Sequence, residues 1–244
     1  MSWLKKLFGT GAKQPQPIRV ELPGPGEHET VYGDQPLRKE WAESVLRAEG
    51  IPVNPHLPMI ESEAETTLRT ADEVANRLRA LVAAGFKASE SPDQALVDSI
   101  VAERGLRPLF TPEEAAFIDD PDPDEAARIR FSWRCEAAWV LLWALKHVDG
   151  QLGPPRDLCD VPFLAGTVYR DVDLASRGLR PANDILNEAD LTYRCHWAVR
   201  QAALDGKPPP VGLHPGVTME RHHALNWLIG YNDGADWDEV TTDT

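Results

Sequence analysis

The side chains best suited to chemistry lie on segments near the C-terminus that the sequence predicts to be helical. Glu220 and His223 stand three residues apart, which puts a carboxylate and an imidazole on one helix face, as in helical di-iron proteins. Such a centre needs a second Glu-x-x-His unit and further carboxylates, for which Glu136, His147 and His196 are loose candidates. Glu220 and His223 are therefore weak candidate metal ligands, and we expect no cofactor.

A second possibility is acid–base chemistry. Histidine titrates near neutral pH, so His196, His222 or His223 beside a carboxylate would suit a general acid or base. No nucleophile motif accompanies them, since Gly-x-Ser-x-Gly, His-Glu-x-x-His and a Gly-x-Gly-x-x-Gly after a strand are all missing from the sequence. A small hydrolase or metal-dependent enzyme that uses this His/Glu cluster is therefore the alternative function.

Two further interpretations involve no catalysis, and both start from polar residues at positions where the helical pattern predicts burial. An unpaired buried charge costs on the order of several kcal/mol, so these groups must pair with one another or face a cleft that binds a ligand. In a sealed network, Arg134 or Arg194 would pair with Glu136 or Glu220, and the histidines would bond to Asn226 or to the backbone. The residues concerned are Arg134, Glu136, Arg194, His196, Arg200, Glu220, Arg221, His222, His223 and Asn226.

The elements that carry these residues are predicted to be helices. Thr70 with Glu73 and Thr111 with Glu114 have the spacing of a capping box, and Pro92 takes the first position of a helix. No useful strand alternation or internal repeat appears. We predict an all-α fold, a single compact multi-helix domain with Pro-rich extended loops. The helices are expected near 37–48, 70–85, 91–105, after 111, and at 122–148, 162–175, 181–206 and 217–229.

The segment 122–148 is predicted to be the longest helix. Ile129, Trp133, Val140 and Trp143 recur at steps of three, four and seven residues, and a second apolar stripe runs beside them. A helix that is apolar around so much of its circumference is usually central and buried. We therefore expect this helix to form the middle of the core.

The chain is strongly acidic. Lysine and arginine total 25 against 39 aspartates and glutamates, which gives a formal net charge of -14. This charge repels nucleic acids and anionic membranes at long range, so we expect no nucleic-acid partner. Two runs without a basic residue, 113–125 and 233–243, hold much of the excess. Such runs form either a solvated surface or a docking surface for a basic protein partner.

The three cysteines, Cys135, Cys159 and Cys195, form no close pair and indicate neither a disulfide framework nor a paired-cysteine zinc site. No apolar run approaches the roughly 20 residues that a membrane span needs. The first twelve residues also lack the features of a secretory signal. A cytoplasmic location is therefore expected.

Residues 1–35 are expected to form a flexible N-terminal tail before a helical domain over 36–244. The tail starts with a short amphipathic segment and continues through a stretch rich in glycine and proline, which is typical of a linker. One or two helical turns are marginal alone in water, so we expect a frayed end, and weak contact with a membrane or a partner is the alternative. The apolar residues of this start, placed around two lysines, are Trp3, Leu4, Leu7 and Phe8.

Several blocks of the chain carry a likeness to a known family. They are 50–54 leading to 68–70, 131–136 with 143–145, 196–200, 220–228, and 237–238 with 242–244. Together they resemble the bacterial family catalogued as domain of unknown function 4272, over 37–244. The resemblance implies a bacterial cytoplasmic protein and no particular activity. Its last two blocks add Trp227, Trp237 and Asp238 to the candidate cluster.

These observations favour a non-enzymatic cytoplasmic protein-binding module, of the adaptor or toxin-neutralising type. Its acidic surface or its polar cleft would engage a protein partner. Geometry separates this function from the enzymatic alternative. Convergence of Glu136, His196, Glu220 and His223 on an open pocket would favour an enzyme, and sealed, paired side chains would disfavour one.

Overall fold

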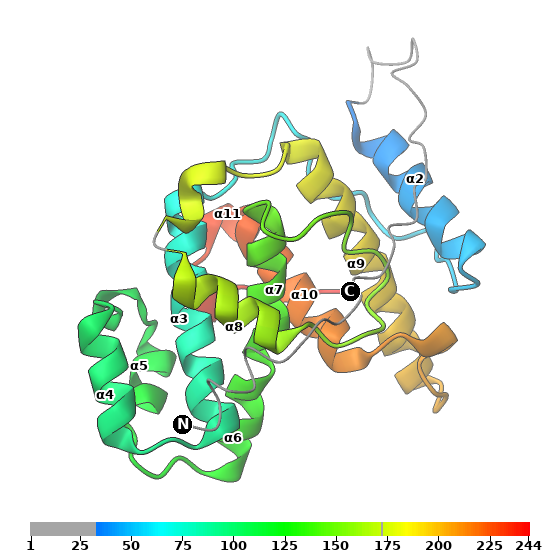
Figure 1. The fold of residues 1–244 in the computed structure, drawn as a ribbon. Coiled ribbons are helices and arrows are strands. Elements are labelled where there is room, and N and C mark those ends of the chain that lie inside the picture. Colours follow the sequence, from blue (N-terminus) through cyan, green and yellow to red (C-terminus); the bar gives the residue numbers. More distant parts are fainter. Residues whose placement is uncertain (1–32, 172) are drawn as a thin grey trace.

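A computed structural model describes residues 33–171 and 173–244 and shows helices but no strand in this part of the chain (Figure 1). The predicted all-α class is confirmed. Almost all of the predicted tail, including its four apolar residues, lies outside the described residues. The α-helices are α2 (Gln35–Ala48), α3 (Ala71–Glu90), α4 (Gln94–Glu103), α5 (Pro112–Asp119), α6 (Glu125–Ser132), α7 (Arg134–Ala144), α8 (Val161–Arg170), α9 (Ala182–Leu204), α10 (Pro215–Leu228) and α11 (Tyr231–Gly234). Short 3-10 turns are η1 (Arg107–Leu109), η2 (Leu174–Arg177), η3 (Pro210–Gly212) and η4 (Trp237–Glu239).

Local sequence signals fix several helix starts. Both predicted capping boxes form, because the hydroxyls of Thr70 and Thr111 each accept a hydrogen bond from a glutamate N–H three residues later at 3.2 Å. The prediction for Pro92 is wrong by two residues, since α4 begins at Gln94 after an N-cap at Asp93. Asp93 keeps an extended ψ of 137°, so Pro92 lies before the helix rather than inside its first turn.

The predicted single helix over 122–148 is also wrong. It divides into α6 and α7 at Trp133, α7 ends at Ala144, and α9 is the longest described helix at 23 residues. At the break the N–H of Glu136 donates to the carbonyl of Trp133, an i→i+3 bond that tightens the turn. The Trp133 ring lies so close to Gly216 of α10 that a Cβ there would stand 2.8 Å from it. Tertiary packing on α10 thus coincides with the break.

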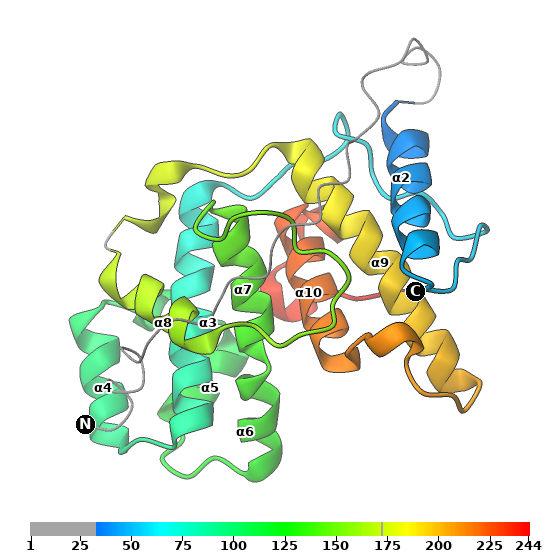
Figure 2. The same ribbon diagram turned by 45° about the vertical axis from the view of Figure 1, so that its right-hand side comes forward.

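Helix α7 nevertheless occupies the centre that the sequence predicted. It packs against α3 on one side and α10 on the other, while α9 packs against α10 and carries α2 on its outer face (Figure 2). The main core contains the buried residues of α7 with those of α3 and α10, and a second core joins α2 to α9. Within the described residues, no helix is both long and apolar enough to cross a membrane.

Candidate functional site

The predicted polar cluster does not form one site; it divides into separate buried groups. The first is an ion pair between α7 and α10, in which Arg134 Nη1 donates to Glu220 Oε2 at 3.1 Å. Burial raises the pKa of Glu220, and the charge of Arg134 opposes that shift. This is one of the pairings that the sealed-network interpretation allowed.

A second group surrounds Arg194, which pairs with neither of the two glutamates that the sequence offered as partners for Arg134 or Arg194. Arg194 makes a two-pronged pair with Asp190, one turn earlier on α9, through Nε and Nη2 at 2.9 Å each. Its Nη1 also lies 3.8 Å from Glu43 of α2. The pair joins α9 to α2 rather than to α7 or α10. Sequence reasoning overlooked Asp190, although its i,i+4 spacing to Arg194 is a recognisable signal.

A third group is centred on the buried Arg221, whose Nη1 donates to the carbonyl of Leu152 at 3.3 Å. Burial lowers the pKa of Arg221, and Glu136 and Glu188 oppose that shift. Glu136 Oε1 accepts the N–H of Cys159 at 2.8 Å. Glu188 accepts the N–H groups of Leu152 and the next residue at 3.1 Å each. The group therefore holds the loop after α7 against α9 and α10.

Glu188 is the most perturbed carboxyl of this group and was missed from sequence. Burial raises its pKa to about 7, and the charge of Arg221 and two backbone N–H groups oppose that shift. Its spacing from Ile185 and Thr192 places it on the buried stripe of α9, a signal that could have identified it.

The fourth group is a histidine pair between α9 and α10. His196 Nδ1 and His222 Nδ1 lie 2.8 Å apart, so one ring must carry the proton and the other must accept it. Burial lowers the pKa of His196 to about 4 and that of His222 to about 3. Asn226 donates to the carbonyl of Thr241 at 2.9 Å, and His223 bonds to the backbone of Trp237, which is the other kind of partner that the sequence allowed for the histidines.

The residues that the family resemblance contributed form a fifth group near the C-terminus. His223 packs edge-on against Trp237 at 4.7 Å, and Trp227 contacts Trp237 in the same way at 5.4 Å. Burial lowers the pKa of His223 to about 4. Asp238 is exposed beside this cluster. These contacts anchor the C-terminal segment against α10.

The four residues of the enzymatic alternative thus do not converge. Glu136 and Glu220 are engaged by the Cys159 N–H and by Arg134, and the histidines belong to two other groups. Among the described residues, no set of three or more His, Cys, Asp or Glu side chains is arranged to hold a metal ion. The weak candidate ligands Glu220 and His223 have an arginine and a tryptophan as their neighbours.

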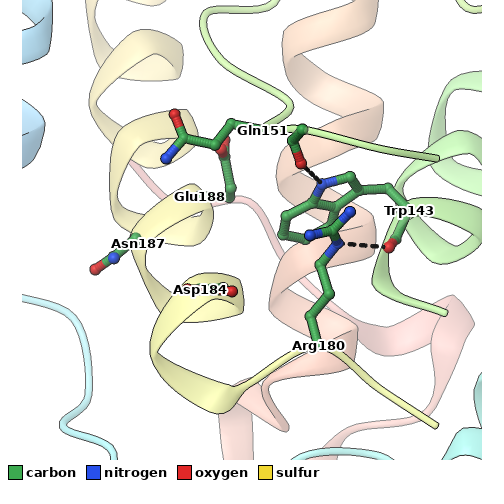
Figure 3. Close-up of a pocket in the computed structure, with 7 residues that line it drawn as sticks. Trp143, Gln151, Arg180, Asp184, Asn187 and Glu188 are labelled. Carbon is green, nitrogen blue, oxygen red and sulfur yellow. Dashed lines mark hydrogen bonds between the residues drawn. The ribbon is translucent and has the colours of Figure 1, made fainter. Parts of the chain in front are cut away.

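A small pocket of about 80 Å³ opens beside Glu188 (Figure 3). Arg180 stacks on the ring of Trp143 at 4.7 Å and donates to the Trp143 carbonyl at 2.8 Å. The Trp143 indole N–H donates to the carbonyl of Gly150 at 2.8 Å. These bonds make the walls rigid and leave room for a few water molecules, at about 30 Å³ each. The pocket is lined by Trp143, Gly150, Gln151, Arg180, Asp184, Asn187 and Glu188.

A larger hollow of about 570 Å³ is lined by residues of α4, of α5 and of the connection between them. We name it the α4–α5 groove. Val101, Ala102 and Ile118 give it an apolar floor. Arg107 and Asp119 stand at its rim and form a two-pronged ion pair at 2.6 and 3.0 Å. The remaining lining residues are Gln94, Asp98 and Gly105.

The two acidic runs, far apart in sequence, meet in space. The N–H of Glu113 lies 3.4 Å from Asp238 Oδ2, so the start of one run touches the middle of the other. We call the exposed carboxylates of 113–125 and 233–243 the acidic surface. Three of them, Glu113, Asp119 and Asp122, pair with arginines. Those that form no ion pair with any described residue are Asp120, Asp124, Glu125, Asp233, Asp236, Asp238, Glu239 and Asp243.

Comparison with known proteins places these groups within one matched region. A family model described as a domain of unknown function (DUF4272) matches residues 38–240. The match runs from within α2 to the residue after η4, so it includes every buried group described above. No curated protein and no solved structure matches the chain.

Proposed function

We propose that this chain, which belongs to the family described as domain of unknown function (DUF4272), is a non-enzymatic protein-binding module of the bacterial cytoplasm. We propose that the module is of the adaptor or toxin-neutralising type. Its acidic surface engages a partner protein that presents a basic surface.

The observation that carries this proposal is the meeting of the two acidic runs at Glu113 and Asp238. Most carboxylates of the acidic surface form no ion pair with an arginine or a lysine of the described residues. Like charges brought together repel one another, and that repulsion is relieved when a cationic partner binds. Complementary charge also speeds the encounter of two proteins and selects against acidic competitors.

The enzymatic alternative has less support from the geometry. The pKa values of His196, His222 and His223 are lowered to about 4, 3 and 4, so all three are neutral at pH 7. Neutral histidines can act as bases, but His196 and His222 are buried against each other, and His223 is half-buried against Trp237. A general base must lie within hydrogen-bond reach of a substrate. Sealed side chains fit a structural network better.

The test compares two triple variants in a pull-down with chemical cross-linking and mass spectrometry. The first neutralises part of the acidic surface through Asp236→Asn, Asp238→Asn and Glu239→Gln. The matched control neutralises exposed acids elsewhere through Glu40→Gln, Glu63→Gln and Asp157→Asn. Three surface contacts of about 0.5 kcal/mol each predict a roughly ten-fold loss of affinity in the first variant alone.

The captured protein should be basic over the cross-linked region, and its binding should weaken with added salt. Equal capture by both variants, or cross-links that map away from 113–125 and 233–243, would remove the acidic surface as the binding site.

A further inference from the structure

The α4–α5 groove has a size and a lining that suit a short amphipathic peptide. Its volume of about 570 Å³ falls within the range of sites that enclose drug-sized ligands. Such a volume holds a few side chains of a peptide. Val101 and Ile118 are buried in the floor, while Ala102 is exposed on the α4 side. Apolar side chains that enter the groove would cover this floor and would themselves be removed from contact with water, which is favourable.

The rim of the groove has negative charge available for a ligand. Lys87 lies beneath it with Nζ bonded to the carbonyls of Ile118 and Asp120. Burial lowers the pKa of Lys87, and Asp120, Asp98 and Asp119 all oppose that shift, so these carboxylates lie around one point. Asp119 is neutralised by Arg107. Asp98 and Asp120 form no ion pair with a described residue, and the three carboxylates outnumber the charges of Arg107 and Lys87 by one, so the rim keeps a net negative charge for a cationic ligand.

The chain itself contains a segment of this composition. Residues 3–8 read Trp-Leu-Lys-Lys-Leu-Phe, four apolar side chains around two lysines, and lie outside the described residues. The connection from Gly9 to residue 32 is long enough for this segment to reach any face of the domain. Fully extended it spans about 80 Å, against a radius of gyration of about 17 Å for a domain of this size.

We propose that residues 3–8 dock in the α4–α5 groove of their own chain, with the apolar side chains on the floor and Lys5 and Lys6 beside Asp98 and Asp120. Short linkers rich in glycine give tethered segments an effective concentration on the order of millimolar. A contact too weak to hold a free peptide therefore holds a tethered one. The groove adjoins the acidic surface through Asp119, so the docked segment is an internal competitor for a basic partner.

This inference goes beyond the proposed function, since it requires no second protein and would stand if the partner were not basic. The test uses the full chain with the photo-reactive residue benzoylphenylalanine in place of Phe8. After illumination, monomeric and dimeric products are separated and the cross-links are mapped by mass spectrometry. We expect cross-links from residue 8 to 94–119 within the monomer.

Two pairs of variants make the result specific. Ala102→Lys fills the groove with a positive charge and should lower the yield at 94–119 roughly ten-fold, whereas Ala126→Lys makes the same change at an exposed site on α6 and should leave it unchanged. Lys5→Glu with Lys6→Glu should also abolish the cross-links. Adding Asp98→Lys and Asp120→Lys to that double variant should restore them, because the charges are then exchanged.

Far-ultraviolet circular dichroism and thermal melts confirm that each variant folds. Cross-links confined to the dimer would show that a second copy occupies the groove and would overturn docking within one chain. Cross-links elsewhere, or a yield indifferent to Ala102→Lys, would also overturn it. Neither result affects the test of the acidic surface, which uses residues outside the groove.

Discussion

At the scale of single residues, the interior of this protein holds charges and histidines that water would otherwise solvate. Arg134 and Arg194 each pair with a carboxylate, Arg134 with Glu220 on a different helix and Arg194 with Asp190 one turn away. Such pairs contribute little net stability when intact, yet removing one partner leaves a buried charge alone. Their energetic effect is therefore best measured by breaking them one at a time.

Glu220→Gln should lower the free energy of unfolding by about 2 to 3 kcal/mol, because Arg134 then loses a charged acceptor in a largely buried position. Arg134 keeps some exposure to water, which limits the loss. The matched control is Glu113→Gln, which breaks the exposed pair with Arg130 and should cost no more than about 1 kcal/mol. Urea unfolding at pH 7 measures both. A wild-type value for Glu220→Gln would contradict the structural role of the pair.

The histidines should make the protein sensitive to acid. The pKa values of His196, His222 and His223 in the folded state are lowered to about 4, 3 and 4, while an unfolded histidine titrates near 6.5. The unfolded chain therefore binds these protons first. Stability is fully present above about pH 6.5 and is lost as the pH falls toward about 4.

Each such histidine adds about 1.4 kcal/mol of stability loss per pH unit within this window. Glu188 acts in the opposite direction, because its raised pKa of about 7 favours the folded state at low pH. The comparison of variants isolates one group. His223→Gln should reduce the slope of unfolding free energy between pH 6 and pH 4.5, and His56→Gln at an exposed site should not. Identical slopes for the two variants would argue against a neutral, half-buried His223.

At the scale of elements, contacts between helices decide where some helices end. The capping residues at Thr70 and Thr111 operate locally and were readable from the sequence. The division between α6 and α7 was not, because Trp133 keeps helical angles and its ring packs on Gly216 of a helix more than eighty residues later. The contact between Trp133 and Gly216 arises only when the two helices pack in the tertiary structure.

Gly216→Ala tests this contact. A Cβ at that position would lie 2.8 to 3.0 Å from three atoms of the Trp133 ring, so the ring or helix α10 must move. We expect a loss of about 1 to 3 kcal/mol in the free energy of unfolding. The double variant with Trp133→Leu, which removes most of the ring, should recover much of it relative to Trp133→Leu alone. Additive losses would mean that the two residues do not touch.

At the scale of the whole molecule, the net charge of -14 opposes the compact state. Much of that charge is exposed, so dissolved salt can screen it. Raising the ionic strength from about 0.01 M to about 1 M shortens the Debye length from about 30 Å to about 3 Å. The melting temperature should therefore rise with sodium chloride, by about 2 to 4 °C for each kcal/mol of repulsion removed.

Differential scanning calorimetry measures this rise. The variant with Asp236→Asn, Asp238→Asn and Glu239→Gln removes three of the repelling charges and should show a smaller rise than the wild type. A melting temperature that falls with salt would mean that attractive ion pairs, rather than repulsion, dominate the surface.

The sequence by itself determined the all-α class, most helix positions, both capping boxes and the list of polar residues that had to be buried. These features depend on periodicity and on contacts within a few residues. It also allowed the pairing of Arg134 with Glu220, though as one of several.

Only the tertiary structure decided which buried groups meet. Arg194 pairs with Asp190, His196 and His222 bond to each other, and Glu188 accepts two backbone N–H groups of the loop after α7. A buried polar group must find a partner, but helical periodicity specifies a face and not the neighbour across from it. That neighbour depends on how α7, α9 and α10 pack together. The division of one expected cluster into separate sealed groups follows from that packing.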